Sequence, residues 1–164
     1  MNAALRLSWY KFKHHYMDFV KVLLGIIAFE GLILYIQDKG FLKDFETTRM
    51  TLFLLLFSTS LLIVVQNSIY ISKERSVLNR DFFSGLSRSA FAIASMGIHA
   101  FFAVLETIVF ILSYSIFSKY FDKEFPDAGH IFSSYRWEVG ITVLLVFLAS
   151  HFIALFISAL VGKS

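Results

Sequence analysis

The sequence has 164 residues, 57% of them apolar and 18% aromatic, and a formal net charge of +3. A soluble domain of this size does not carry so many long apolar runs, so the composition excludes a water-soluble globular protein and indicates a multi-pass membrane protein. The absence of cysteine excludes disulfide bonds and thiolate metal sites. The small net charge gives no indication of nucleic-acid binding.

The first eighteen residues predict an amphipathic helix that lies in the membrane interface. Leu5, Trp9 and Phe12 recur four and three residues apart, while lysines and histidines lie off that stripe. Such a helix places its apolar face at the acyl boundary and its basic side chains toward anionic headgroups. We expect residues 1–18 to form this helix and residues 19–164 to form the transmembrane domain.

Four apolar runs are long enough to cross about 30 Å of hydrocarbon as helices. They cover residues 19–36, 52–71, 90–117 and 139–161. The predicted fold class is therefore an all-α membrane protein with four transmembrane helices, an N-terminal amphipathic interfacial helix and a short cytoplasmic helix between the second and third spans. Small residues every four positions on the last span, Ser150, Ala154 and Ser158, indicate close packing against another helix.

Segment 72–86 connects the second and third spans, is net basic and has a broad apolar face when drawn as a helix. Loops rich in Lys and Arg stay on the cytoplasmic side of a membrane. The two loops on the opposite side carry charges that nearly cancel. We therefore expect the plasma (inner) membrane as the location, with segment 72–86 and both chain termini in the cytoplasm.

The residue pattern of this segment is specific enough to compare with a known family. Its pattern is an acidic-basic pair, then a basic-acidic pair, then a glycine before the next span: Glu74-Arg75, Arg80-Asp81 and Gly85-Leu86-Ser87-Arg88-Ser89-Ala90-Phe91. It resembles the coupling helix and the start of the third span in ABCG-like permeases of ABC exporters, above all the bacterial ones. The resemblance implies that five residues couple the chain to a partner: Glu74, Arg75, Arg80, Asp81 and Gly85.

The resemblance also implies a function. The chain would be the transmembrane permease of an ATP-driven exporter, with ATP and magnesium bound by a separate ATP-binding cassette subunit or domain and with a second permease copy or a companion permease beside it. We expect no cofactor and no ATPase activity in this chain. Its ending, Gly162-Lys163-Ser164, mimics a phosphate-binding loop, but the first glycine of that motif would fall at Ile157.

The usual permease of this family has six spans and this sequence has four, so the remaining spans are expected from a longer chain or another chain.

Two other functions stay open at this point. The alternatives are a small membrane scaffold or assembly subunit whose basic loop holds a cytoplasmic partner, and a proton- or ion-conducting subunit. The sequence leaves the substrate open, since apolar aromatic spans fit lipids, amphipathic drugs and peptides equally.

Polar side chains at membrane depth are the remaining candidates for function. They are Glu30, Gln66, His99, Glu106 and His151. Ionisable groups inside a bilayer face protein or water and form pairs. His99 and Glu106 are seven residues apart, which places both on one face of the third span. They favour either a proton relay or polar lining of a substrate path, or hydrogen bonds that fix helix packing. Their spacing predicts no metal site.

Overall fold

Four long helices make up the part of the chain that can be described. The computed structural model describes residues 2–37, 45–68, 83, 85, 87–123, 131 and 133–161, with side chains for those from 16 to 160. The helices are α1 (Asn2–Ile36), α2 (Phe45–Ser68), α4 (Arg88–Tyr120) and α5 (Tyr135–Val161). Each contains a stretch long and apolar enough to cross a membrane. The predicted all-α class with four transmembrane helices is thereby confirmed.

The helices extend further than the apolar runs from which they were predicted. α2 begins at Phe45, inside the segment expected to be a loop. Glu46 lies in its first turn, where its Oε2 atom is 2.8 Å from Nη2 of Arg49. A carboxylate in this position interacts favourably with the helix N-terminus. α5 likewise begins at Tyr135, with Glu138 in its first turn. Polar turns of this kind let a helix continue past the hydrocarbon.

α4 is the longest helix that lies wholly within the described side chains. Its 33 residues span about 50 Å at 1.5 Å per residue, more than the thickness of a bilayer core. Ser87 caps its start, where the Ser87 hydroxyl accepts a hydrogen bond from the Ala90 amide. Asp122 ends it by adopting a left-handed backbone with φ 55°. Ser87 and Asp122 therefore mark the start and the end of α4, although hydropathy alone does not locate these ends.

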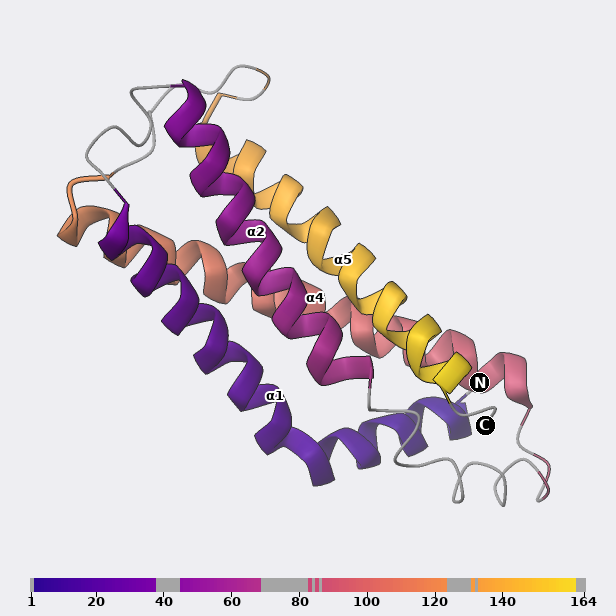
Figure 1. The fold of residues 1–164 in the computed structure, drawn as a ribbon. Coiled ribbons are helices and arrows are strands. Elements are labelled where there is room, and N and C mark those ends of the chain that lie inside the picture. The colour runs from indigo at the N-terminus through magenta and orange to yellow at the C-terminus, as the bar shows by residue number, and fades with distance from the viewer. Residues whose placement is uncertain are drawn as a thin grey trace.

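The helices run alternately up and down as a bundle in which each helix packs against two others (Figure 1). α1 contacts α2 and α4, and α5 also contacts α2 and α4. We call the end where α4 begins and where α2 and α5 end the base, and the opposite end, where α1 and α4 end, the top. Both marked chain ends lie near the base (Figure 1).

α1 is continuous from Asn2 to Ile36, so the boundary predicted at residue 18 lies inside a single helix. Figure 1 shows that α1 bends sharply, so that its first part runs in a different direction from the part that packs in the bundle. The side chains of residues 1–15 lie outside the described part. The amphipathic, interfacial character of this first part therefore stays a prediction.

The core of the bundle is apolar and is contributed by all four helices. Its members are Val22, Ile26, Leu34, Leu55, Ile63, Ala103, Phe110, Tyr114, Val143 and Phe147. The small-residue stripe of α5 faces inward, since Ser150, Ala154 and Ser158 are all buried. Gly25 allows α1 and α2 to approach closely, because a Cβ atom there would lie 2.5 Å from a Leu62 methyl group.

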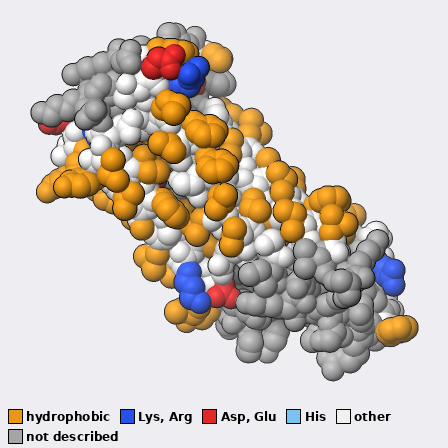
Figure 2. All heavy atoms as spheres, in the orientation of Figure 1, with side chains coloured by type: hydrophobic (Ala, Val, Ile, Leu, Met, Phe, Trp, Pro, Cys, Tyr) orange, Lys and Arg blue, Asp and Glu red, His pale blue; other side chains and the backbone are white. Residues whose placement is uncertain are grey.

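The surface is apolar along the length of the bundle and charged at its ends. Figure 2 shows hydrophobic side chains over the middle of the described surface, with the visible Lys, Arg, Asp and Glu side chains gathered toward the two ends. Large residues such as Phe53, Leu145 and Phe156 are more than half exposed. Exposure of such an apolar surface to water is unfavourable, whereas lipid chains solvate it well.

Candidate functional site

A row of buried polar side chains follows the inner face of α4. His99 and Glu106 are 2% and 0% exposed, and His151 of α5 and Glu30 of α1 are both fully buried. His99 and Glu106 therefore share one face of α4, as their spacing predicts. The ionisable residues expected to face protein rather than lipid do so, which is the arrangement that the cost of a charge in hydrocarbon requires.

Three of these residues form a continuous chain of hydrogen bonds, which we call the buried triad. Nδ1 of His99 lies 3.0 Å from Nδ1 of His151, and Nε2 of His151 lies 2.8 Å from Oε2 of Glu106. His151 thus uses both ring nitrogens to join two residues of the neighbouring helix. Among the residues that the structure describes, the other carboxyl oxygen of Glu106 has no hydrogen-bond partner.

Glu30 forms a separate polar contact nearer the top. Its Oε2 accepts a hydrogen bond from the hydroxyl of Ser113, which ties α1 to α4. Its Oε1 is buried and, within the described ranges, has no partner. Ser113 was not predicted as a site residue, although it follows Glu106 by seven positions and so shares the buried face of α4.

Phe110 and Phe147 lie between these two polar contacts. Phe110 follows Glu106 by one turn on α4, and Phe147 precedes His151 by one turn on α5. Their rings meet edge to face with centroids 5.8 Å apart. Both side chains are almost completely buried. The aromatic pair therefore separates the buried triad from the Glu30–Ser113 contact.

Lys123 forms a buried clasp at the top that the sequence did not indicate. Its ammonium group donates hydrogen bonds to the carbonyl oxygens of Leu34 and Gln37, and its own carbonyl accepts one from the Tyr114 hydroxyl at 3.1 Å. The last carbonyls of a helix lack intrahelical partners and attract cations. Lys123 therefore fastens the end of α1 to the segment that follows α4.

Replacing Lys123 with methionine should lower the free energy of unfolding by about 1–2 kcal/mol, the size of a polar contact between membrane helices. Methionine keeps most of the buried stem but removes the donor. The thermal midpoint in detergent measures the effect. Lys119→Met is the matched control, because Lys119 lies in the last turn of α4 and is exposed. Equal midpoints for both variants would contradict the clasp.

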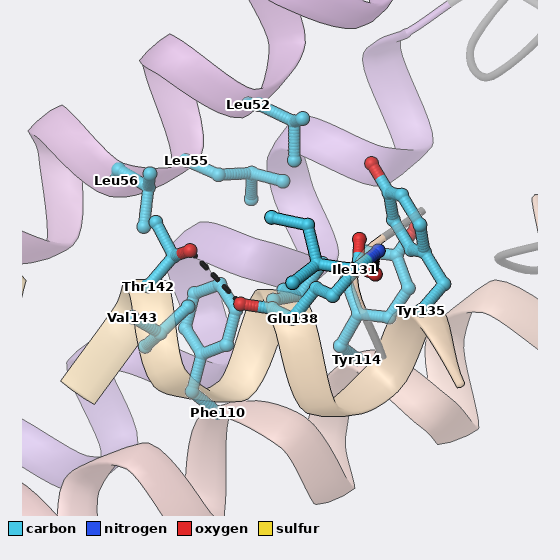
Figure 3. A pocket seen from close by; sticks show the side chains of 11 residues that line it. Leu52, Leu55, Leu56, Phe110, Tyr114, Ile131, Tyr135, Glu138, Thr142 and Val143 are labelled. Atoms are coloured by element: carbon cyan, nitrogen blue, oxygen red, sulfur yellow. Dashed lines mark hydrogen bonds between the residues drawn. The ribbon is translucent and has the colours of Figure 1, made fainter. Parts of the chain in front are cut away.

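A half-open cavity of about 250 Å³ lies near the top between α2, α4 and α5. Figure 3 shows its wall of Leu52, Leu55 and Leu56 from α2 facing Phe110 and Tyr114 from α4. The Glu138 carboxylate at its rim accepts a hydrogen bond from the amide of Ile131. The volume is below the range of ligand pockets that enclose a drug-sized molecule, and the lining is mainly apolar.

The remaining predicted residues are only partly located. Gln66 is half-buried near the end of α2. Gly85 is exposed and adopts φ +103°, a left-handed conformation that strains any other residue. The predicted helix 72–86 lies otherwise outside the described residues, apart from Phe83. Its four charged coupling residues are among those not described: Glu74, Arg75, Arg80 and Asp81.

The buried triad is arranged in series and does not converge on a common point. The two nitrogens of the His151 ring point in different directions, one toward each neighbour. In the described ranges, no group of three or more histidine and carboxylate side chains is placed to hold a metal ion. The geometry is suited to hydrogen bonding and to moving a proton between the three groups.

Four helices long and apolar enough to cross a membrane, with a row of buried polar side chains beside an apolar core, indicate an integral membrane protein. Residues 5–164 match the family described as ABC-2 type transporter, and the chain belongs to this family. It is thus a multi-pass membrane protein and a transmembrane permease component of an ABC transporter. The family implies pairing with an ATP-binding cassette protein. Comparisons with curated proteins and with solved structures found no match.

Proposed function

We propose that this chain is the permease of an ABCG-like exporter and that segment 72–86 is its coupling helix. ATP and Mg²⁺ would bind a partner ATP-binding cassette protein, and this chain would hydrolyse no ATP itself. A second copy of the chain or a companion permease would complete the path through the plasma membrane. The family match over residues 5–164 carries the proposal, because it covers the helices on both sides of the segment.

The position of segment 72–86 supports a coupling role. It links the end of α2 at Ser68 to the start of α4 at Arg88, and both of these ends lie at the base of the bundle (Figure 1). The Ser87 cap starts α4 immediately after the segment. Because the segment joins α2 to α4, and α4 contacts both α1 and α5, a push on the segment would reach all four helices.

The charges near the base favour the cytoplasmic side for this end. Arg88 and Lys21 are exposed there, in addition to the basic residues of segment 72–86. At the top, Arg49 is paired with Glu46, Lys123 bonds to backbone carbonyls, and Lys119 and Arg136 are exposed. Counted along the sequence, nine Lys and Arg fall on this side and six on the other, and such an excess is the pattern of a cytoplasmic face. Nucleotide-driven movement there would then favour one of two alternating conformations.

Alanine at Glu74 or Arg75 should uncouple the two proteins without separating them. The chain is copurified in nanodiscs with its partner ATP-binding cassette protein, and ATP hydrolysis is compared with that of the free partner. We expect each variant to lose the stimulation by about tenfold, within the usual range of coupling free energies. Lys119→Ala is the control, because Lys119 is exposed near the top.

The outcomes separate the competing functions. Normal hydrolysis and transport by Glu74→Ala and Arg75→Ala would rule out the coupling role of segment 72–86. Loss of the complex itself would favour a scaffold, in which the segment only holds a partner. Ion flux through the wild-type chain in liposomes without any ATPase would favour a conducting subunit.

A further inference from the structure

Glu30 is a buried acid with few hydrogen-bond donors around it. Its side chain is 0% exposed. Its Oε2 contacts the Ser113 hydroxyl, and in the part of the chain that the structure describes its Oε1 has no hydrogen-bond partner. An ordinary glutamic acid is almost fully ionised at neutral pH, because water solvates its charge. Glu30 is shielded from water, so the bonds available inside the bundle decide which form fits there.

The Ser113 hydroxyl can donate to only one acceptor at a time, since it has one hydrogen and two lone pairs. Besides Glu30, it lies 2.9 Å from the carbonyl oxygen of Val109 and 3.2 Å from that of Phe110, about one turn earlier on α4. If Glu30 is ionised, the hydroxyl hydrogen points to Oε2 and the two carbonyl contacts have no hydrogen. Within the described residues, this one bond is then all that supports the charge.

A protonated Glu30 satisfies the same positions more completely. A hydrogen on Oε2 is donated to a lone pair of Ser113 Oγ, and the Ser113 hydroxyl then donates to the Val109 carbonyl at 2.9 Å. A serine hydroxyl in a helix often bonds to the carbonyl four residues earlier. Both hydrogens have acceptors and no charge is buried. Oε1 is left as a neutral carbonyl oxygen, which costs much less than an unpaired carboxylate oxygen.

We propose that Glu30 and Ser113 form a proton-binding site between α1 and α4, in which the bound proton supplies the hydrogen bond that joins the two helices. On release, the O–H bond of Glu30 breaks and the proton passes to water. The Ser113 hydrogen then turns from Val109 to Oε2 of Glu30, and the site carries a charge of −1. The ligand is a proton, and the site is additional to the proposed coupling of the chain to an ATPase.

Within the described ranges, the neighbouring charged groups supply no counterion for Glu30. α1 packs against α2 and α4. Lys123 directs its ammonium group to the carbonyls of Leu34 and Gln37, one and two turns beyond Glu30, and the buried Tyr114 hydroxyl donates to the Lys123 carbonyl. The other charged groups of these helices lie in the exposed pairs Asp18–Lys21 and Glu46–Arg49, among exposed residues at the helix ends, or in the triad beyond Phe110 and Phe147.

A protonated Glu30 is detectable by the infrared band of its carboxyl group. The full chain in nanodiscs is labelled with ¹³C at the side-chain carboxyl of glutamate, and its spectrum is recorded at neutral pH. A solvated carboxyl is almost fully ionised at this pH, so a band of protonated glutamic acid reports a buried one. We expect Glu30→Gln to lose one such band. Glu106→Gln, the same change at another fully buried carboxyl, should retain that band.

Ser113→Ala distinguishes the two arrangements without changing the acid. If a protonated Glu30 donates to Ser113, loss of this acceptor shifts the existing band to higher frequency, and this is the expected result. If an ionised Glu30 depends on Ser113 as its donor, the variant gains a band that wild type lacks. A band that appears only in the variant, or one that does not move, overturns the proposal. So does a Glu30→Gln spectrum with every wild-type band in place. If Glu30→Gln fails to fold, Ser113→Ala still decides.

The bound proton also makes the stability of the bundle fall as pH rises. The folded chain keeps a proton that the unfolded chain releases, so the equilibrium constant for unfolding rises by up to about tenfold per pH unit above the ordinary range of a glutamate. Glu30→Gln should lack this contribution, because an amide does not ionise. SDS titration over a pH series, with helicity as the signal, measures the difference in slope. An equal pH dependence in wild type and Glu30→Gln contradicts a proton bound at Glu30.

Discussion

Replacement of Glu106 with alanine is expected to lower the free energy of unfolding by about 2–3 kcal/mol. About 1–2 kcal/mol comes from the lost contact with His151, the range for polar contacts between membrane helices. The remainder comes from the space left by the side chain, since an unfilled cavity costs about 24 cal/mol per Å³. Glu106 is 0% exposed, so neither lipid nor water fills this space without rearrangement.

Glu106→Gln is the matched control, because glutamine retains the volume and can hydrogen-bond to His151 in either direction. Unfolding is followed by SDS titration in mixed micelles, with helicity as the signal. We expect the glutamine variant to remain within about 1 kcal/mol of wild type. A loss of equal size for both variants would mean that the acid itself, rather than the contact and the volume, stabilises the bundle.

Phe147→Ala is expected to destabilise the protein by about 2 kcal/mol for a different reason. In lipid, the separated helix already holds its phenylalanine in an apolar solvent, so no transfer free energy is lost. What remains is the cavity between α5 and α4, where the Phe147 ring packs against Phe110. The cost is therefore smaller than the 3–5 kcal/mol typical of a water-soluble core.

Phe152→Ala serves as the control, because Phe152 lies on the same helix but is 42% exposed. Its ring faces the lipid side, so we expect a change of less than about 0.5 kcal/mol. The same SDS titration measures both variants. If Phe152→Ala were the more damaging change, a second helix outside this chain would cover that face of α5.

The membrane helices could be predicted because their apolar runs are long and their charges are few. Their ends could not, since Glu46 and Glu138 stabilise first turns that hydropathy assigns to loops. The boundary predicted at residue 18 lies inside the continuous helix α1, and the interfacial character of the first part stays a prediction. Hydropathy indicates which residues lie in lipid. A helix ends where its backbone hydrogen bonds end, and these continue beyond the hydrocarbon.

The candidate site was predictable along one helix but not between helices. A spacing of seven places His99 and Glu106 on one face, as observed. Nothing in the sequence specifies that His151 of α5 joins them, because that depends on which helices are neighbours and at what height. The sequence also did not indicate the contacts of Lys123, because its partners are backbone carbonyls, which every residue has. The family resemblance was correct for the permease, while the coupling role of Glu74 and Arg75 stays a prediction.

The Lys123 clasp limits how the bundle can open. α1 and α4 cannot part at the top without exposing a buried ammonium group and the two carbonyls that hold it, so this end acts as a pivot. A small rotation about one end displaces the far tip of a rod roughly 50 Å long by about twice as much as its middle. Motion therefore has its largest amplitude at the base, beside the segment that a partner would grip.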